Sequence, residues 1–146
     1  MTQPTLSPNI IQALVTDGHI LPIHDPQPVI TQEQTSLNRL RHRTTRNLAE
    51  QYLNGYDRLF RHISLLLLAH SYELTACQLH QTLRKICQQW QANNVVTAMI
   101  QQRHTLKKSV SPSADVDLQA LNTLQTLLGL FDSTDAAAFR LADENR

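Results

Sequence analysis

The chain is short of the residue types that many specialised folds and sites require. It has three glycines, two cysteines and an aromatic content of 5% among 146 residues. None of the glycines, Gly18, Gly55 and Gly129, belongs to a glycine-rich loop of the kind that surrounds phosphate groups. Cys77 and Cys87 match neither the spacing of a zinc site nor a disulfide framework. We therefore expect no bound metal and no cofactor.

Long apolar runs and a strong net charge are also missing. The longest apolar run is Leu65–Ala69, far below the roughly 18 residues of a membrane span. The first residues, MTQPTLSPN, do not combine a basic region with an apolar core, so we read no signal peptide. These features predict a cytoplasmic protein that does not contact a membrane. The formal net charge of +1 excludes the strongly basic field of a dedicated duplex-DNA binder, so any nucleic-acid contact has to come from a local patch.

What the chain does have is apolar residues at helical spacing along most of its length. The expected fold class is all-α, an up-and-down bundle of four to five helices that forms a single domain over residues 1–146. Residues 1–30 are expected to form a short helix, which begins at Ser7-Pro8 and ends at Gly18, and then an extended proline-rich strap. The bundle is expected over 31–131, and 132–146 is a polar tail with room for a short helix from Thr134.

Within the bundle, the pattern from residue 31 to residue 70 is long for a single helix. A break is expected at RHRTTRN, where Thr44, Thr45 and Asn47 offer capping side chains, so we predict helices at about 31–43 and 46–70. Further helices are expected after a cap at Thr75, at about 94–109, and over the leucine-rich stretch that ends at Phe131. The helix after Thr75 is expected to carry an apolar face of Leu79, Leu83, Ile86 and Trp90.

The first candidate for a binding site is a group of basic residues. Four arginines fall within eight positions, and two lysines follow later in the chain. A local patch of this kind suits the phosphates of a nucleic acid, but it is also what an ordinary solvated helix face looks like. The candidate phosphate-binding residues are Arg39, Arg41, Arg43, Arg46, Lys107 and Lys108.

Two further pairs combine an arginine with a histidine four positions away, which places both on one helix face. These pairs are Arg58 with His62, and His80 with Arg84. An arginine can neutralise a phosphate while a neighbouring histidine moves a proton, but the same spacing is common by chance. A structural role for each pair stays open.

The order of the predicted elements points to a family resemblance. A long helix with tyrosines (AEQYLNGYDRLFRHISLLLLAHSY) is followed by a helix that opens near His80 (CQLHQTLRKI), by MIQQRHTLKK, and by a leucine-rich helix (DLQALNTLQTLLGLF). From about residue 31 to residue 131 this pattern resembles the HEPN superfamily. Its members are small helical bundles found in bacterial toxin-antitoxin and anti-phage defence systems.

The resemblance implies a metal-independent ribonuclease site. In such a site an arginine neutralises the scissile phosphate, and a histidine a few residues later transfers a proton. Arg103 matches the arginine and His104 the polar residue that follows it, so these two are the candidate catalytic residues. The family histidine would fall at Lys108 or Ser109, so the motif is degenerate. An exposed lysine ammonium stays protonated at neutral pH and is a poor general base.

Two functional hypotheses follow. The first is a HEPN-like, RNA-associated component of a toxin-antitoxin or defence system, non-catalytic or weakly active, which forms a homodimer through the face that carries Arg103. Its partners would be RNA and a cognate toxin or antitoxin protein, for instance a nucleotidyltransferase-like one. The second is a non-enzymatic interaction module, such as an antitoxin, immunity or adaptor protein, which the many Gln, Asn and Thr residues and the near-neutral charge favour. The missing histidine argues against enzymatic activity without deciding the question.

Overall fold

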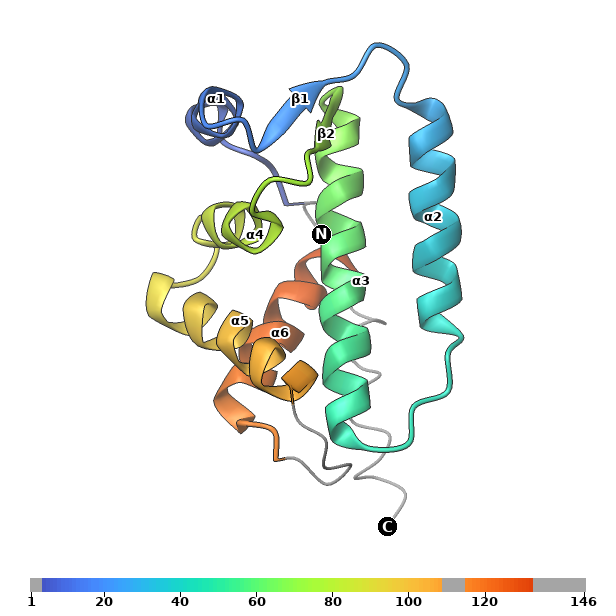
Figure 1. Cartoon of the computed structure of the whole chain (residues 1–146), viewed down its shortest axis with the longest axis vertical. Helices are drawn as coiled ribbons and strands as arrows, with labels where there is room; N and C mark the ends of the chain where they lie inside the picture. Colours follow the sequence, from blue (N-terminus) through green and yellow to red (C-terminus); the bar gives the residue numbers. More distant parts are fainter. Residues whose placement is uncertain (1–3, 109–114, 133–146) are drawn as a thin grey trace.

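The chain folds into a mostly helical structure, which was obtained as a computed structural model and describes residues 4–108 and 115–132. In these two ranges it forms six helices and one two-stranded antiparallel sheet (Figure 1). The sequence predicted helices alone, and the sheet corrects that prediction. In chain order the elements are α1 (Pro8–Thr16), β1 (Ile20–Pro22), α2 (Gln27–Arg41), α3 (Leu48–Ala69), β2 (Tyr72–Leu74), α4 (Leu79–Cys87), α5 (Asn93–Lys108) and α6 (Leu118–Phe131).

The predicted break between two long helices is confirmed, because α2 ends at Arg41 and α3 begins at Leu48. Asn47 is the N-cap of α3, and its side chain accepts a hydrogen bond from the backbone N–H of Glu50 at 2.9 Å. The start of α2 differs from the expectation. This helix already begins at Gln27, within the segment predicted to be an extended strap, with Pro26 as its N-cap and Pro28 in its first turn. A proline there loses no helical hydrogen bond, so these prolines begin the helix and do not prevent it.

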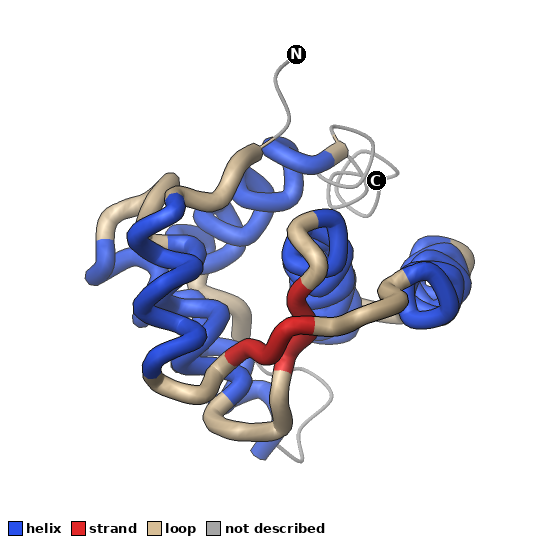
Figure 2. Tube along the Cα trace, turned by 90° about the horizontal axis from the view of Figure 1, so that it is seen from above, coloured by secondary structure: helices blue, strands red, loops and turns tan. Residues whose placement is uncertain are grey.

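The sheet joins two segments that the sequence did not predict to be strands. β1 pairs with β2 in antiparallel register, with Ile20 opposite Leu74 and Pro22 opposite Tyr72. Seen from above, the two strands lie between the α2–α3 pair and the remaining helices (Figure 2). Thr75, predicted to cap α4, serves this junction instead: its hydroxyl donates to the carbonyl oxygen of Gly18 at 2.9 Å.

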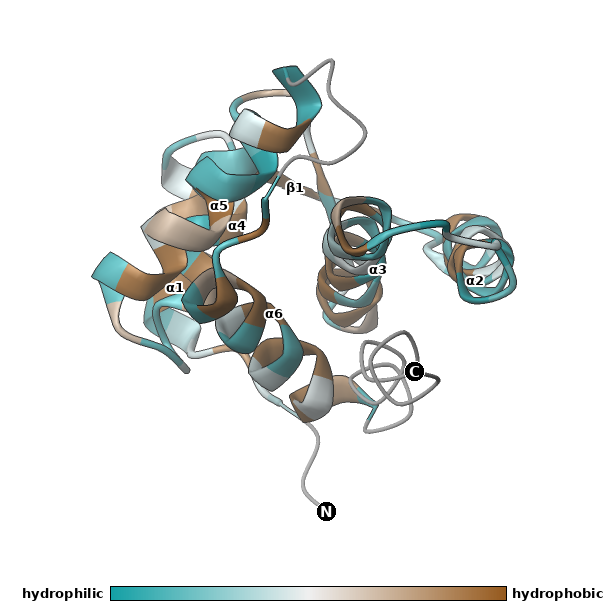
Figure 3. Ribbon diagram, turned by 90° about the horizontal axis from the view of Figure 1, so that it is seen from below, coloured by the Kyte–Doolittle hydropathy of each residue, from teal (hydrophilic) through white to brown (hydrophobic). Residues whose placement is uncertain are grey.

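The core lies where α3 faces α4, α5 and α6, and the brown, hydrophobic sides of these helices turn toward one another (Figure 3). α2 buries Leu37 and Leu40 and packs on α3, while much of its remaining surface is hydrophilic (Figure 3). The predicted apolar face of α4 is only partly buried, because Leu79 is 37% exposed and Trp90 lies beyond the end of the helix. The largest fully buried side chains are Tyr52, Tyr56, Leu14, Ile20, Leu59, Ile63, Leu67, Leu68, Leu83, Ile86, Met99 and Leu124.

Two predictions about the ends of the bundle have different outcomes. The helix expected at about 94–109 is confirmed as α5, and the tail helix expected from Thr134 lies outside the described residues. Over residues 4–108 and 115–132, no helix combines the length and the apolar character that crossing a membrane would need.

Candidate phosphate-binding cleft

A cleft with a volume of about 730 Å³ lies between α2, α3 and the segment that leads from β2 into α4. Arg103 of α5 and His80 of α4 also line it. Basic, acidic and apolar side chains all contribute to its walls. We refer to this feature as the α2–α3 cleft.

Three side chains from three helices meet in one cluster at this cleft. The guanidinium carbon of Arg103 lies 5.1 Å from the centre of the Tyr56 ring, a cation–π arrangement. A guanidinium nitrogen of Arg103, Nη1, lies 3.4 Å from Nε2 of His80. The other ring nitrogen of His80, Nδ1, lies 3.0 Å from the hydroxyl oxygen of Tyr56. The buried Nε of Arg103 has no hydrogen-bond partner among the described residues.

These contacts define the protonation of the cluster. Arginine can only donate, so Nε2 of His80 is the acceptor in its contact with Arg103. The neutral ring then carries its proton on Nδ1, which donates to the oxygen of Tyr56. Burial, together with the positive charges of Arg103 and His104, lowers the pKa of His80, and the carboxylate of Asp57 opposes this only in part. Arg103 therefore faces a neutral imidazole at neutral pH.

Tyr56 completes the cluster from the side of the core. Burial raises the pKa of its hydroxyl, so the group stays protonated at neutral pH. The Tyr56 ring supports Arg103 from one side, and its oxygen orients the ring of His80. Phe60, one turn further along α3, meets His80 edge to face with ring centres 5.9 Å apart. Both aromatic residues thus fix the direction in which Nε2 points.

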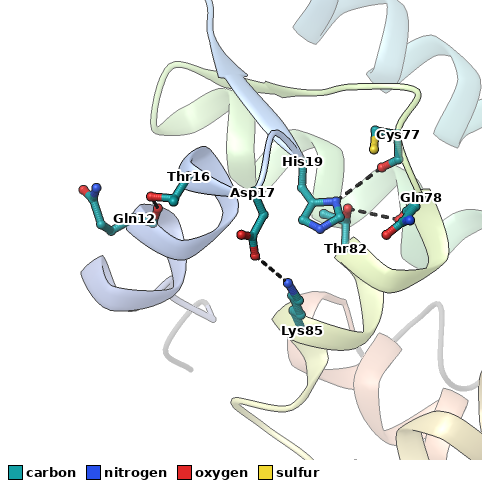
Figure 4. Close-up of polar contacts among 8 residues, drawn as sticks. All are labelled: Gln12, Thr16, Asp17, His19, Cys77, Gln78, Thr82 and Lys85. Atoms are coloured by element: carbon teal, nitrogen blue, oxygen red, sulfur yellow. Dashed lines mark hydrogen bonds and ion pairs between the residues drawn. The ribbon is translucent and has the colours of Figure 1, made fainter.

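Both ends of α4, the helix that carries His80, contact the segment between α1 and β1 (Figure 4). Nδ1 of His19 lies 3.3 Å from the carbonyl oxygen of Cys77, and Nζ of Lys85 lies 2.8 Å from a carboxylate oxygen of Asp17. His19 is buried, whereas both residues of the ion pair are partly exposed. The first contact holds the segment just before α4 and the second holds the last turn of α4, so together they fix the helix that carries His80.

The predicted group of four arginines divides into two pairs. Arg39 and Arg43 line the cleft, and neither guanidinium forms a hydrogen bond or ion pair within the described part of the chain. Arg41 instead forms an ion pair with Asp132 at 3.2 Å. Arg46 lies 2.9 Å from a carboxylate oxygen of Glu50. Only the first pair is therefore placed to contact a ligand in the cleft.

Of the predicted site residues on α5, one lines the cleft and the others do not. Arg103 enters the cleft, while His104 is exposed and is not among the residues that line it. Lys107 and Lys108 are exposed at the end of the helix and do not line the cleft either. The histidine that accompanies Arg103 is thus His80.

Neither of the two predicted arginine–histidine pairs forms a site in the cleft. Arg58 and His62 are both buried; Nε of Arg58 donates to Asn54 at 2.9 Å, and the ring of His62 stacks on Phe131. Arg84 does not line the cleft, so it does not act there together with His80. The sequence paired His80 with Arg84, whereas the structure places His80 beside Arg103, because the packing of α4 against α5 brings these two residues together.

Within residues 4–108 and 115–132, no group of three or more His, Cys, Asp or Glu side chains could hold a metal ion. What the described cleft offers a ligand is arginine, histidine, carboxylate and aromatic side chains. Comparison of the chain with protein-family models, with curated proteins and with solved structures gives no match.

Proposed function

We propose that this chain is a HEPN-like, RNA-associated protein of a toxin-antitoxin or anti-phage defence system, and that it holds an RNA phosphate at Arg103 and His80. The arrangement of Arg103 carries the proposal. Its guanidinium lies on Tyr56 beside a neutral histidine, and its buried Nε lacks a hydrogen-bond partner among the described residues. A phosphate supplies the acceptor oxygens that this guanidinium lacks.

The number of available arginines favours a short segment of single-stranded RNA as the ligand. Arg61 also lines the cleft, but Glu33 occupies it through both carboxylate oxygens, at 2.9 and 3.0 Å. Arg39, Arg43 and Arg103 remain for phosphates. A duplex binder needs more phosphate contacts spread over a wider surface, whereas three arginines around a cleft suit one or two nucleotides of a single strand.

The same residues offer the groups for slow, metal-independent cleavage. When a phosphate replaces His80 as the acceptor of Arg103, Nε2 of His80 becomes able to accept the proton of a 2′-hydroxyl. The hydroxyl oxygen then attacks the phosphorus, and the bond to the 5′ oxygen breaks. That oxygen takes up a proton from water, and the protonated His80 returns its proton to the solvent. A 2′,3′-cyclic phosphate and a 5′-hydroxyl end result. Arg103 stabilises the charge on the phosphate, so His80 supplies the histidine that Lys108 does not.

Filter binding of single-stranded RNA at several salt concentrations tests the binding proposal. With about three phosphate contacts, we expect the logarithm of the binding constant to fall against the logarithm of salt with a slope near −2. Arg103→Ala should weaken binding roughly tenfold or more. Lys107→Ala is the matched control, because it removes an exposed positive charge of α5 outside the cleft. Equal losses for the two variants, or no binding at low salt, would refute the proposal and favour the interaction-module hypothesis.

Cleavage is tested separately, by long incubation of end-labelled RNA in EDTA followed by a denaturing gel. We expect slow cleavage that His80→Ala abolishes and His104→Ala leaves in place. Intact RNA in every lane would remove the catalytic part of the proposal and leave the binding part.

A further inference from the structure

The α2–α3 cleft contains carboxylates that a groove for a bare polyanion would not need. Asp57 and Glu73 line it together with the arginines, and neither side chain forms a hydrogen bond or ion pair within the described ranges. Glu33 differs, because Arg61 neutralises it. An unpaired carboxylate repels the phosphates of a ligand, so such a residue disfavours binding unless it meets a hydrogen-bond donor of that ligand.

The two carboxylates belong to different parts of the cleft. Asp57 follows Tyr56 directly on α3, and its charge acts on His80, so it lies at the end where Arg103 holds a phosphate. Glu73 belongs to β2, the strand that follows the far end of α3. From Asp57 to Ser64, the last residue of α3 that lines the cleft, the helix rises about 10 Å.

The space between the two ends suits a sugar and a base. The volume of about 730 Å³ is far more than one phosphate fills, and it falls within the roughly 300–1,000 Å³ typical of small-molecule pockets. Phe60, Leu74 and the 37% exposed Leu79 supply apolar and aromatic lining. A nucleobase can stack on such side chains while its edge faces a polar group.

We infer that the α2–α3 cleft selects guanine, with the phosphate of the nucleotide at Arg103 and the base edge at the carboxylate of Glu73. This inference rests on the proposed function. Guanine presents two adjacent donors, N1–H and the exocyclic amino group, which match the two oxygens of one carboxylate. Uracil presents a single N–H donor flanked by carbonyl oxygens, which a carboxylate repels. The arginines therefore bind the phosphate of any nucleotide, and Glu73 distinguishes the base.

Calorimetric titration of the full chain with GMP, UMP and inorganic phosphate at low salt tests this inference. We expect GMP to bind roughly tenfold more tightly than UMP, as the loss of a hydrogen bond to a charged group implies. Glu73→Gln should bring GMP close to UMP and leave inorganic phosphate unchanged. Asp57→Asn is the matched control: it removes a carboxylate near the phosphate, so it should strengthen binding of all three ligands and preserve their order. Thermal melts establish that each variant is folded.

A second set of titrations distinguishes free nucleotides from RNA. An octamer of uridines is compared with the same octamer that carries one guanosine, and the guanosine is expected to strengthen binding unless Glu73 is replaced. If GMP and UMP bind equally and both depend on Arg103, the guanine inference is wrong and the proposed function stands. If neither the nucleotides nor the RNA bind, the proposed function itself is wrong.

Discussion

His80 is the residue whose charge should make the cleft sensitive to pH. Burial and the charges of Arg103 and His104 lower its pKa below the ordinary value of 6.5. The ring is therefore neutral at pH 7 and gains a proton only in more acidic solution. The protonated ring adds a positive charge and a second N–H donor beside Arg103. Both changes favour a bound phosphate.

We accordingly predict that binding of single-stranded RNA strengthens as the pH falls from 7.5 through the lowered pKa of His80. An oligouridine is the suitable probe, because neither its phosphodiesters nor its bases titrate in this range. In His80→Gln this dependence should largely disappear. His104→Gln controls for the exposed histidine next to Arg103, and it should retain most of the dependence. Binding that does not change with pH in the unmodified protein would show that the charge of His80 does not reach the ligand.

The sequence identified Arg103 but not its partner, and the reason is geometric. Neighbouring residues of an α-helix point about 100° apart, so a helix that turns Arg103 into a cleft leaves His104 in solvent. His80 lies 23 positions away along the chain and meets Arg103 only through tertiary packing. The spacing of residues along a single helix cannot predict such a contact. The sequence shows that residues 39–46 contain four arginines. It does not show that Asp132 and Glu50 pair with Arg41 and Arg46 and leave Arg39 and Arg43 for the cleft.

Among the helices, α2 depends on α3 for its position. Leu37 and Leu40 bury its apolar side, and the pair of Glu33 with Arg61 links the two helices at 2.9 Å. The side chain of Asn54 on α3 donates to the carbonyl oxygen of Leu40 at 3.0 Å. This bond satisfies an acceptor near the end of α2 and places Arg39 and Arg43 along the cleft.

Asn54→Ala should therefore both destabilise the protein and weaken ligand binding. The substitution removes one of the hydrogen bonds to the buried carbonyl oxygen of Leu40, which keeps the one from the backbone N–H of Arg43, and it removes the oxygen that accepts from the buried Arg58. We expect a loss of roughly 1–3 kcal/mol in the free energy of unfolding, measured by urea titration. Asn38→Ala on the exposed side of α2 is the control, with a change within about 0.5 kcal/mol. Equal stability of the two variants would mean that the bond to Leu40 contributes nothing net.

Element boundaries were predictable where a cap marks them. Asn47 was one of three capping residues that the sequence offered in the predicted break, and it is the N-cap of α3. The strands were not predictable, because three residues are too few to show alternation of polar and apolar side chains. Pro26 and Pro28 were misleading for a different reason: proline disrupts the interior of a helix but suits its first turn.

For the molecule as a whole, the cleft is positioned by the core that α3 forms with α4, α5 and α6. Tyr52 of α3 donates its hydroxyl to the backbone oxygen of Met99 on α5 at 2.6 Å. α6 packs against both helices, and its side chain Leu124 is fully buried. The mostly helical class followed from the apolar spacing, but the arrangement of the helices did not, because amphipathic stripes show that a helix is covered without showing by which neighbour.

Stability should therefore depend on buried side chains of α6 far more than on exposed ones. Leu124→Ala removes a fully buried side chain and leaves a cavity beside α3, which should cost about 2–5 kcal/mol of the free energy of unfolding. Leu118→Ala makes the same chemical change at the start of the same helix, where the side chain is 71% exposed, and should cost less than about 0.5 kcal/mol. Urea unfolding of the two variants measures the difference. If Leu118→Ala proved as costly as Leu124→Ala, the exposed start of α6 would be covered in solution.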